Sequence, residues 1–147
     1  MKPFKSFHEV IDFAINQEIE AAKFYKILAD FVEQPEMAEV LSDLALQELG
    51  HKAKLEAVGA GRANLDDEEI SDLGIVNKVD DVVPDAKMDY TDLLVIGMKK
   101  EEAARKLYTD LARAAQTKQI RDIFLQLSKE EAQHKMRFEL EYELITF

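Results

Sequence analysis

Residues 44–51 read LALQELGH, and residues 127–134 read LSKEEAQH. Each stretch ends in Glu-x-x-His, formed by Glu48 and His51 in the first and by Glu131 and His134 in the second. The two copies lie 83 positions apart (131 − 48 and 134 − 51). Residues three apart are neighbours on one face of an α-helix, so each Glu is expected to face the same way as its His. The repeat therefore predicts two equivalent helices.

The same offset extends to a second kind of segment. It relates Glu18 to Glu101 (101 − 18 = 83) and Tyr25 to Tyr108 (108 − 25 = 83). Around these residues, apolar or small side chains recur at steps of three and four, which is the pattern of one helix face. The two matching stripes are Ile11, Ala14, Glu18, Ala21, Tyr25 and Leu28, and Leu94, Gly97, Glu101, Ala104, Tyr108 and Leu111. With the stripes around the Glu-x-x-His motifs, the pattern predicts four helices in two hairpins.

We expect an all-α protein, an antiparallel four-helix bundle that forms a single domain over residues 1–147. The helical hairpins are expected at residues 6–58 and 91–145, separated by residues 59–90, which hold three of the five glycines. That segment is either an interdomain linker or a long crossover. We favour the crossover, because a helix of roughly 22 residues is about 33 Å long and a structureless loop of this length is uncommon in a compact domain.

Local signals predict most helix ends. Ser6 opens a capping box before the first helix, and the stretch Asp89–Asp92 is expected to cap the third. Pro35 suits the first turn of the second helix, where its missing N–H costs nothing. Gly59 and Gly61 are expected to end that helix. No glycine or proline marks the junction of the third and fourth helices, so only the repeat places it.

Composition excludes several classes of partner and site. The formal net charge is −11, so nucleic acid and anionic membranes are not expected partners, because like charges repel. The chain has no cysteine, which removes disulfides, thiolate zinc sites and a rubredoxin-type centre. The first residues lack the apolar core of a signal peptide, and no apolar run is long enough to span a bilayer. We expect a cytoplasmic protein.

Carboxylates occupy positions where such stripes normally carry leucine or isoleucine. Four ionised carboxylates buried together repel one another and lose their hydration. Two divalent cations would neutralise them, and two Glu-x-x-His helices with two single-Glu helices are the ligand set of di-metal carboxylate bundles. The six predicted ligands are Glu18, Glu48, His51, Glu101, Glu131 and His134. Mixed carboxylate and imidazole ligation suits iron or manganese, and zinc is possible.

Tyr25 and Tyr108 are expected to hydrogen-bond to ligating carboxylates and to orient them. The simpler interpretation is that they are core aromatics, just as a buried histidine can be a hydrogen-bonded core residue. Small residues on the stripes are expected to leave room for the metal and an exogenous ligand; they are Ala14, Ala21, Gly97 and Ala104. Several other glutamates are expected on the surface, among them Glu102 and Glu130.

These motifs resemble the ferritin-like di-iron carboxylate superfamily, most closely its rubrerythrin-like branch. The resemblance rests on AINQEIEAAKFY (14–25), LALQELGH (44–51), GMKKEEAARKLY (97–108) and LSKEEAQH (127–134). It implies that Glu48 and Glu131 bridge two irons. It also implies that Glu18 and Glu101 are terminal ligands, with His51 and His134 completing each iron. Rubrerythrins carry a further Glu three residues after the third-helix ligand, where this chain has Ala104, so the site should be more symmetric.

The leading functional hypothesis is a di-iron protein that reacts with peroxide, dioxygen or ferrous iron, as a ferrous iron oxidase or a peroxide reductase. Electrons would come from a separate donor or from ferrous iron, and we expect a homodimer. One alternative is a non-catalytic metal-binding or structural bundle. Another is an oxygenase acting on an organic substrate, which would need an apolar pocket beside the metals.

Overall fold

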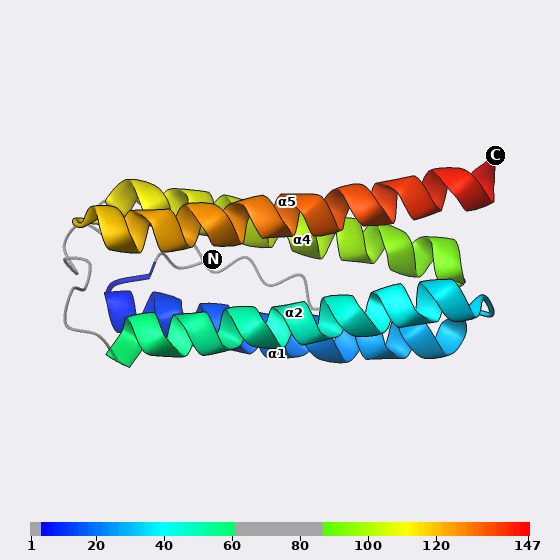
Figure 1. The fold of residues 1–147 in the computed structure, drawn as a ribbon, viewed down its shortest axis with the longest axis horizontal. Helices are drawn as coiled ribbons and strands as arrows, with labels where there is room; N and C mark the ends of the chain where they lie inside the picture. The colour runs from blue at the N-terminus through cyan, green and yellow to red at the C-terminus, as the bar shows by residue number, and fades with distance from the viewer. Residues whose placement is uncertain (1–3, 61–86) are drawn as a thin grey trace.

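The computed structural model describes residues 4–60 and 87–147, which form four long helices. They are α1 (Phe7–Phe31), α2 (Pro35–Ala60), α4 (Tyr90–Ala114) and α5 (Lys118–Thr146). Helices α1 and α2 form one antiparallel hairpin, α4 and α5 form another, and the hairpins lie side by side along their length (Figure 1). The predicted all-α four-helix bundle is confirmed.

The described helix ends are consistent with a crossover, although they do not test it. Helix α2 ends at one end of the bundle, and α4 begins at the opposite end (Figure 1). The crossover expected at residues 59–90 falls mostly on residues 61–86, which lie outside the described residues. The crossover and the single domain over residues 1–147 therefore stay predictions.

Two helix starts follow the predicted capping. The Ser6 hydroxyl accepts a hydrogen bond from the Glu9 N–H at 3.1 Å. The Glu9 carboxylate does not close the expected box on Ser6, because it accepts from the Lys5 N–H at 2.9 Å instead. At α4 the box is complete: Asp89 accepts from the Asp92 N–H at 2.9 Å, and Asp92 accepts from the Asp89 N–H at 3.2 Å. These bonds satisfy N–H groups that have no partner within the helix.

The ends of α2 and the start of α5 agree only in part with expectation. Pro35 is the first residue of α2, as predicted. Helix α2 continues to Ala60, so Gly59 lies in its last turn, and the second predicted end residue, Gly61, lies outside the described residues. A Cβ atom at Gly59 would lie 3.2 Å from Ile11 Cγ2, so this glycine allows α1 and α2 to approach closely. Helix α5 begins after Thr117, whose hydroxyl accepts from the Ile120 N–H at 3.2 Å.

The core divides into two apolar clusters, one toward each end of the bundle. The first contains Phe7, Val10, Ile11, Ala14, Leu55, Val58, Leu107, Leu111, Ile120, Phe124 and Leu127. The second contains Ala21, Phe24, Leu28, Met37, Leu41, Leu44, Leu93, Leu94 and Phe138. Burying one such large apolar side chain contributes roughly 1.5–3 kcal/mol. The clusters therefore hold the helices together on both sides of the middle turns, where the four predicted carboxylate ligands lie.

Two of the small residues serve packing rather than metal access. A Cβ atom at Gly97 would lie 3.3 Å from the Phe138 ring, so Phe138 fills the space beside this glycine. Ala14 is fully buried in the first apolar cluster. The expectation that these two residues leave room for an exogenous ligand is wrong, because neighbouring side chains occupy that space.

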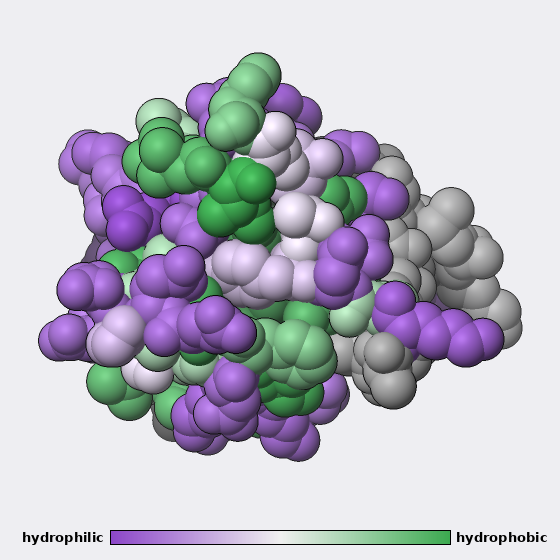
Figure 2. Space-filling view, turned by 90° about the vertical axis from the view of Figure 1, so that its right-hand side faces the viewer, coloured by the Kyte–Doolittle hydropathy of each residue, from purple (hydrophilic) through white to green (hydrophobic). Residues whose placement is uncertain are grey.

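One end of the bundle carries exposed apolar side chains. They include Phe31 at the end of α1 and a group near the end of α5 (Leu140, Leu144, Ile145 and Phe147). Figure 2 shows this end, with hydrophobic and hydrophilic residues side by side on its face. Among the residues that the structure describes, no helix is both long and apolar enough to cross a bilayer.

Candidate metal centre

One glutamate near the middle of each helix projects into the bundle. These are Glu18 on α1, Glu48 on α2, Glu101 on α4 and Glu131 on α5. Each residue is at most 2% exposed. The structure thus brings together four carboxylates that are 30 to 113 positions apart in sequence (48 − 18 and 131 − 18). Such burial is unfavourable for ionised carboxylates unless protons or cations neutralise them.

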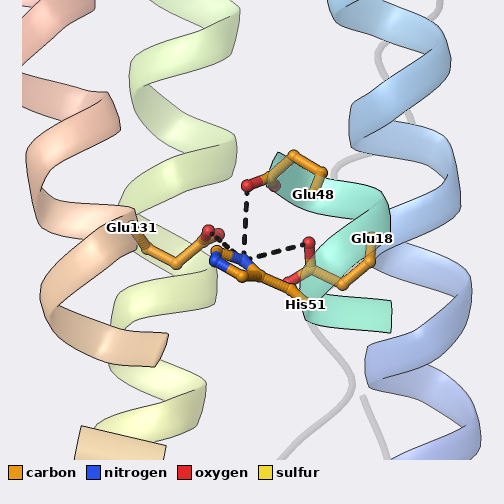
Figure 3. Close-up of side chains that lie close together, drawn as sticks. All are labelled: Glu18, Glu48, His51 and Glu131. Atoms are coloured by element: carbon orange, nitrogen blue, oxygen red, sulfur yellow. Dashed lines mark ion pairs between the residues drawn. The ribbon is translucent and has the colours of Figure 1, made fainter. Parts of the chain in front are cut away.

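The His51 side chain reaches carboxylates from three helices. Its Nδ1 atom lies 2.9 Å from Glu131 Oε1, 3.4 Å from Glu48 Oε1 and 3.6 Å from Glu18 Oε2. Figure 3 shows the ring between Glu131 on one side and Glu18 and Glu48 on the other. His51 and Glu48 share a face of α2, as their spacing predicted. The shortest contact of His51 is nevertheless to Glu131, which lies across the bundle on α5.

The second histidine repeats this arrangement. His134 Nδ1 lies 3.0 Å from Glu48 Oε1, 3.6 Å from Glu101 Oε1 and 3.6 Å from Glu131 Oε1. The two imidazole rings are nearly parallel, at 10° with centroids 5.9 Å apart. The 83-residue repeat of the sequence therefore corresponds to two matching halves of one buried site.

Two overlapping groups of ligand atoms result. The His51 cluster consists of Glu18, Glu48, His51 and Glu131, and the His134 cluster consists of Glu48, Glu101, Glu131 and His134. Within each cluster the candidate ligand atoms all lie within 4.8 Å of one another. Glu48 and Glu131 belong to both clusters, whereas each other ligand belongs to one. Either cluster has the residue types and spacing to hold a metal ion.

The donor atoms themselves fit a cation. Inward-facing atoms without a hydrogen-bond partner include Nδ1 of both histidines and carboxylate oxygens of Glu18, Glu48 and Glu131. Lone pairs facing one another repel unless a proton or a cation lies between them. The shortest nitrogen–oxygen distances of 2.9 and 3.0 Å also fit, because ligands bound at right angles about 2.1 Å from one ion are about 3.0 Å apart.

Burial and mutual repulsion change the protonation of these groups. Burial, and then the charge of Glu101, raise the pKa of Glu48 and of Glu131 well above the usual range of a carboxyl group. Burial lowers the pKa of His134, but its interactions with Glu101 and Glu48 outweigh burial and raise that pKa to about 10. Without metal, the site therefore retains protons that a divalent ion must displace.

Each tyrosine hydroxyl donates to a carboxylate on the opposite hairpin. Tyr25 on α1 donates to Glu101 Oε1, and Tyr108 on α4 donates to Glu18 Oε1. Burial, followed by nearby glutamate charges, raises the pKa of both phenols well above 10. The phenols therefore remain donors, and each fixes one oxygen of its carboxylate. Tyr108 holds Glu18 Oε1 while Glu18 Oε2 faces His51. Tyr25, in contrast, holds the same Glu101 oxygen, Oε1, that faces His134.

Replacing Tyr108 with phenylalanine is expected to weaken metal binding at the His51 cluster about 10- to 100-fold, the usual cost of losing an orienting partner. The ring and its packing remain, but Glu18 Oε1 loses its donor. Titration of metal-free protein with a divalent ion would measure the change. Tyr142→Phe, eleven residues beyond Glu131 on α5, is the matched control and should leave the titration unchanged. Equal affinities for Tyr108→Phe and wild type would refute the orienting role.

The outer nitrogen of each imidazole faces a residue whose role sequence reasoning missed. Gln47 Oε1 lies 2.8 Å from His134 Nε2. Glu130 Oε2 lies 3.5 Å from His51 Nε2, and this oxygen is buried without a hydrogen-bond partner. Glu130 is therefore not the solvated surface residue that was expected. Positions 47 and 130 are equivalent in the repeat and both carry a long side chain with an acceptor oxygen, but the contacts themselves depend on how the hairpins meet.

A cavity of about 380 Å³ reaches the carboxylates from the seam between α1 and α4. Ala21 and Ala104 line it, as expected for small residues that leave space beside the site, together with Phe13 and Leu107. At its rim Glu102 is bound by Arg105 and Lys135, and the hydrogen bond from Arg105 lowers the pKa of Glu102 to about 2. Glu102 is thus paired with two cations, rather than simply solvated.

A four-helix bundle with two Glu-x-x-His motifs and two further glutamates at its centre has the architecture of di-metal carboxylate proteins. The family model described as Rubrerythrin matches residues 9–80 and 92–144 of the chain. The chain belongs to the rubrerythrin family. The resemblance inferred from the motifs is therefore confirmed.

A solved structure supports the same fold. The chain is similar to "Hypothetical Protein Pfu-1136390-001 From Pyrococcus furiosus", with a TM-score of 0.75 and 28% sequence identity over 95% of this chain and 89% of that one. No curated protein matches the chain significantly. The neighbour's description names no activity, so only the chemistry of the site bears on the reaction.

Proposed function

We propose that the chain is a di-iron carboxylate protein that reacts with peroxide or dioxygen, as a ferrous iron oxidase or a peroxide reductase. The observation that carries the proposal is the sharing of Glu48 and Glu131 between the two clusters. Shared carboxylates would hold two ions next to each other. When bound, two ferrous ions supply two electrons together to an O–O bond. Manganese or zinc are alternative occupants that the same donor types accept.

The protein supplies position and polarity to this chemistry. His51 and His134 each present Nδ1 to the cluster, while the two tyrosines orient the terminal carboxylates. The apolar clusters on both sides exclude water from the helix interfaces, so small molecules would enter through the cavity between α1 and α4. Ala104 keeps that route open at the position where rubrerythrins are expected to carry a carboxylate.

Iron binding and oxidation test the proposal directly. Metal-free protein reconstituted anaerobically with ferrous iron is expected to bind two ions per chain. Stopped-flow absorbance against hydrogen peroxide and against dioxygen would then rank the two oxidants. Failure to bind iron, manganese or zinc after reconstitution would contradict a metal protein. Two bound irons that react with neither oxidant would favour the non-catalytic alternative.

The cavity supports a second candidate, an oxygenase acting on a small apolar molecule. A volume of about 380 Å³ falls within the usual range for small-molecule pockets. Dioxygen consumption by the diferrous protein should then increase with a panel of small hydrocarbons, and oxygenated products should be detectable by mass spectrometry. Absence of oxygenated product with every member of the panel would contradict the oxygenase and favour oxidation of ferrous iron or reduction of peroxide. A separate electron donor and a homodimer remain predictions.

A further inference from the structure

The two halves of the centre differ at one pair of equivalent positions. Gln47 and Glu130 each precede a shared carboxylate, Glu48 or Glu131, and each faces the outer nitrogen of the histidine on the opposite hairpin. His134 thus has a neutral amide oxygen beside Nε2, whereas His51 has a carboxylate oxygen there. The six ligands repeat in type across the 83-residue offset, so the difference lies in the residues behind them.

This arrangement assigns the tautomer needed for metal binding. A neutral imidazole carries one N–H, so binding of a cation through Nδ1 requires the hydrogen on Nε2. Gln47 Oε1, at 2.8 Å, is placed to accept from Nε2 of His134. Glu130 Oε2 is placed on the same side of His51, at 3.5 Å, where its negative charge polarises the N–H without direct contact.

Glu130 is well suited to act on His51. Its side chain is 26% exposed, yet Oε2 itself is buried and has no hydrogen-bond partner. Lys54 Nζ lies 3.8 Å from the same oxygen, but half of the lysine side chain is exposed, so water screens its charge. The carboxylate therefore retains free acceptor capacity on the side that faces the imidazole.

We propose that Gln47 and Glu130 make the two metal positions inequivalent, so that the position of the His51 cluster binds a divalent ion more tightly and fills first. The inference rests on the proposed metal site. A carboxylate behind a ligating imidazole makes the imidazole a stronger donor than an amide does, and such outer partners change metal affinity about 10- to 100-fold. Both residues are positioning residues, since neither reaches the ions.

Cobalt(II) is a suitable probe, because it accepts the same donors, resists oxidation and reports its binding in visible absorbance. Two single-site proteins separate the positions. Glu101→Ala retains the His51 cluster, and Glu18→Ala retains the His134 cluster. The Glu101→Ala protein is expected to bind one cobalt ion about 10- to 100-fold more tightly than the Glu18→Ala protein.

Exchange of glutamate and glutamine provides the matched variants. Glu130→Gln should weaken cobalt binding in the Glu101→Ala protein and leave the Glu18→Ala protein unchanged. Gln47→Glu should strengthen binding only in the Glu18→Ala protein. A merely structural role would change both backgrounds alike, and that result would overturn the proposal. Circular dichroism of each metal-free variant checks that the bundle is folded.

The otherwise unmodified chain gives a second measurement that avoids the ligand deletions. Wild-type protein should take up two cobalt ions in two resolved steps, and Glu130→Gln should bring the steps together. Two equal steps in wild type, unchanged by Glu130→Gln, would overturn the inequivalence and leave the metal site intact. Absence of cobalt binding in wild type would overturn the proposed function, and this inference with it.

Discussion

Replacing Glu48 with alanine is expected to abolish binding of both metal ions and, with them, the oxidation of ferrous iron. Glu48 belongs to both clusters, and its Oε1 atom faces Nδ1 of both histidines at 3.4 and 3.0 Å. Its removal therefore takes one donor from each of the two metal positions and also removes a carboxylate that the two positions share. The loss in affinity should exceed the factor of about 10–100 seen for outer partners. Metal analysis after reconstitution and stopped-flow oxidation would measure both effects.

Two comparisons make this result specific. Glu18→Ala removes a donor from the His51 cluster alone, so it should retain one ion at the His134 cluster. Glu39→Ala changes an exposed carboxylate on α2 and should retain two. Unchanged metal content and oxidation rate in Glu48→Ala would show that the site is assigned wrongly.

Loss of metal by Glu48→Ala must also be distinguished from loss of the fold. Burial raises the pKa of Glu48, which means that its ionised form is unfavourable in the metal-free protein. Glu48→Gln preserves most of the volume and removes that charge, so the metal-free variant should be at least as stable as wild type at neutral pH. Thermal unfolding of the metal-free proteins checks this. A strongly destabilised Glu48→Gln would mean that the carboxylate supports the bundle itself.

The repeat made the bundle and its six central residues predictable because helical periodicity determines which residues share a face. Capping chemistry located Ser6 and Asp89 for the same local reason. The expectation that Gly59 ends α2 was wrong. A glycine marks a helix end when the chain needs its backbone freedom, whereas here the chain needs its small size. In α2 its missing side chain makes room for Ile11. Thr117 is itself a preferred N-cap residue, but the junction was placed by the repeat alone, so its cap was not anticipated.

The residues behind the ligands depend on how the hairpins meet, which local periodicity does not specify. Gln47 and Glu130 sit about 100° around the helix from the core-facing glutamates that follow them, since 3.6 residues make one turn. Periodicity places such residues near solvent, yet their long side chains reach the histidines of the other hairpin. The pairing of Tyr25 with Glu101 likewise crosses between α1 and α4. Only the assembled bundle reveals these contacts.

The metal-free protein is expected to lose stability as the pH rises from about 5 toward 9, which is opposite in sign to the effect of carboxylates whose pKa folding lowers. Burial and neighbouring charge raise the pKa of Glu48 and Glu131 above the unfolded value of 4.5. The pKa of His134 is also raised, from 6.5 to about 10. The folded state therefore binds more protons than the unfolded state over this range. Each extra proton lowers stability by about 1.4 kcal/mol per pH unit.

Divalent metal should reverse this trend, because metal replaces protons as the neutralising charge. Protons compete with metal for the same atoms, so affinity should rise with pH while metal-free stability falls. At an ion concentration about 1,000 times Kd, binding would add about 4 kcal/mol. Thermal unfolding from pH 5 to pH 9, with and without cobalt(II), measures both slopes.

Removing ionisable groups from the site provides the control for this prediction. In metal-free protein the double variant Glu48→Gln, Glu131→Gln should flatten the decline, because two of the groups with raised pKa are gone. Glu39→Gln, an exposed change on the same helix as Glu48, should leave the slope unaltered. Stability that instead rises with pH in metal-free wild type would mean that the carboxylates are ionised and compensated by other groups. The four carboxylates would then need no metal to neutralise them, and the electrostatic reason for a metal at this site would be lost.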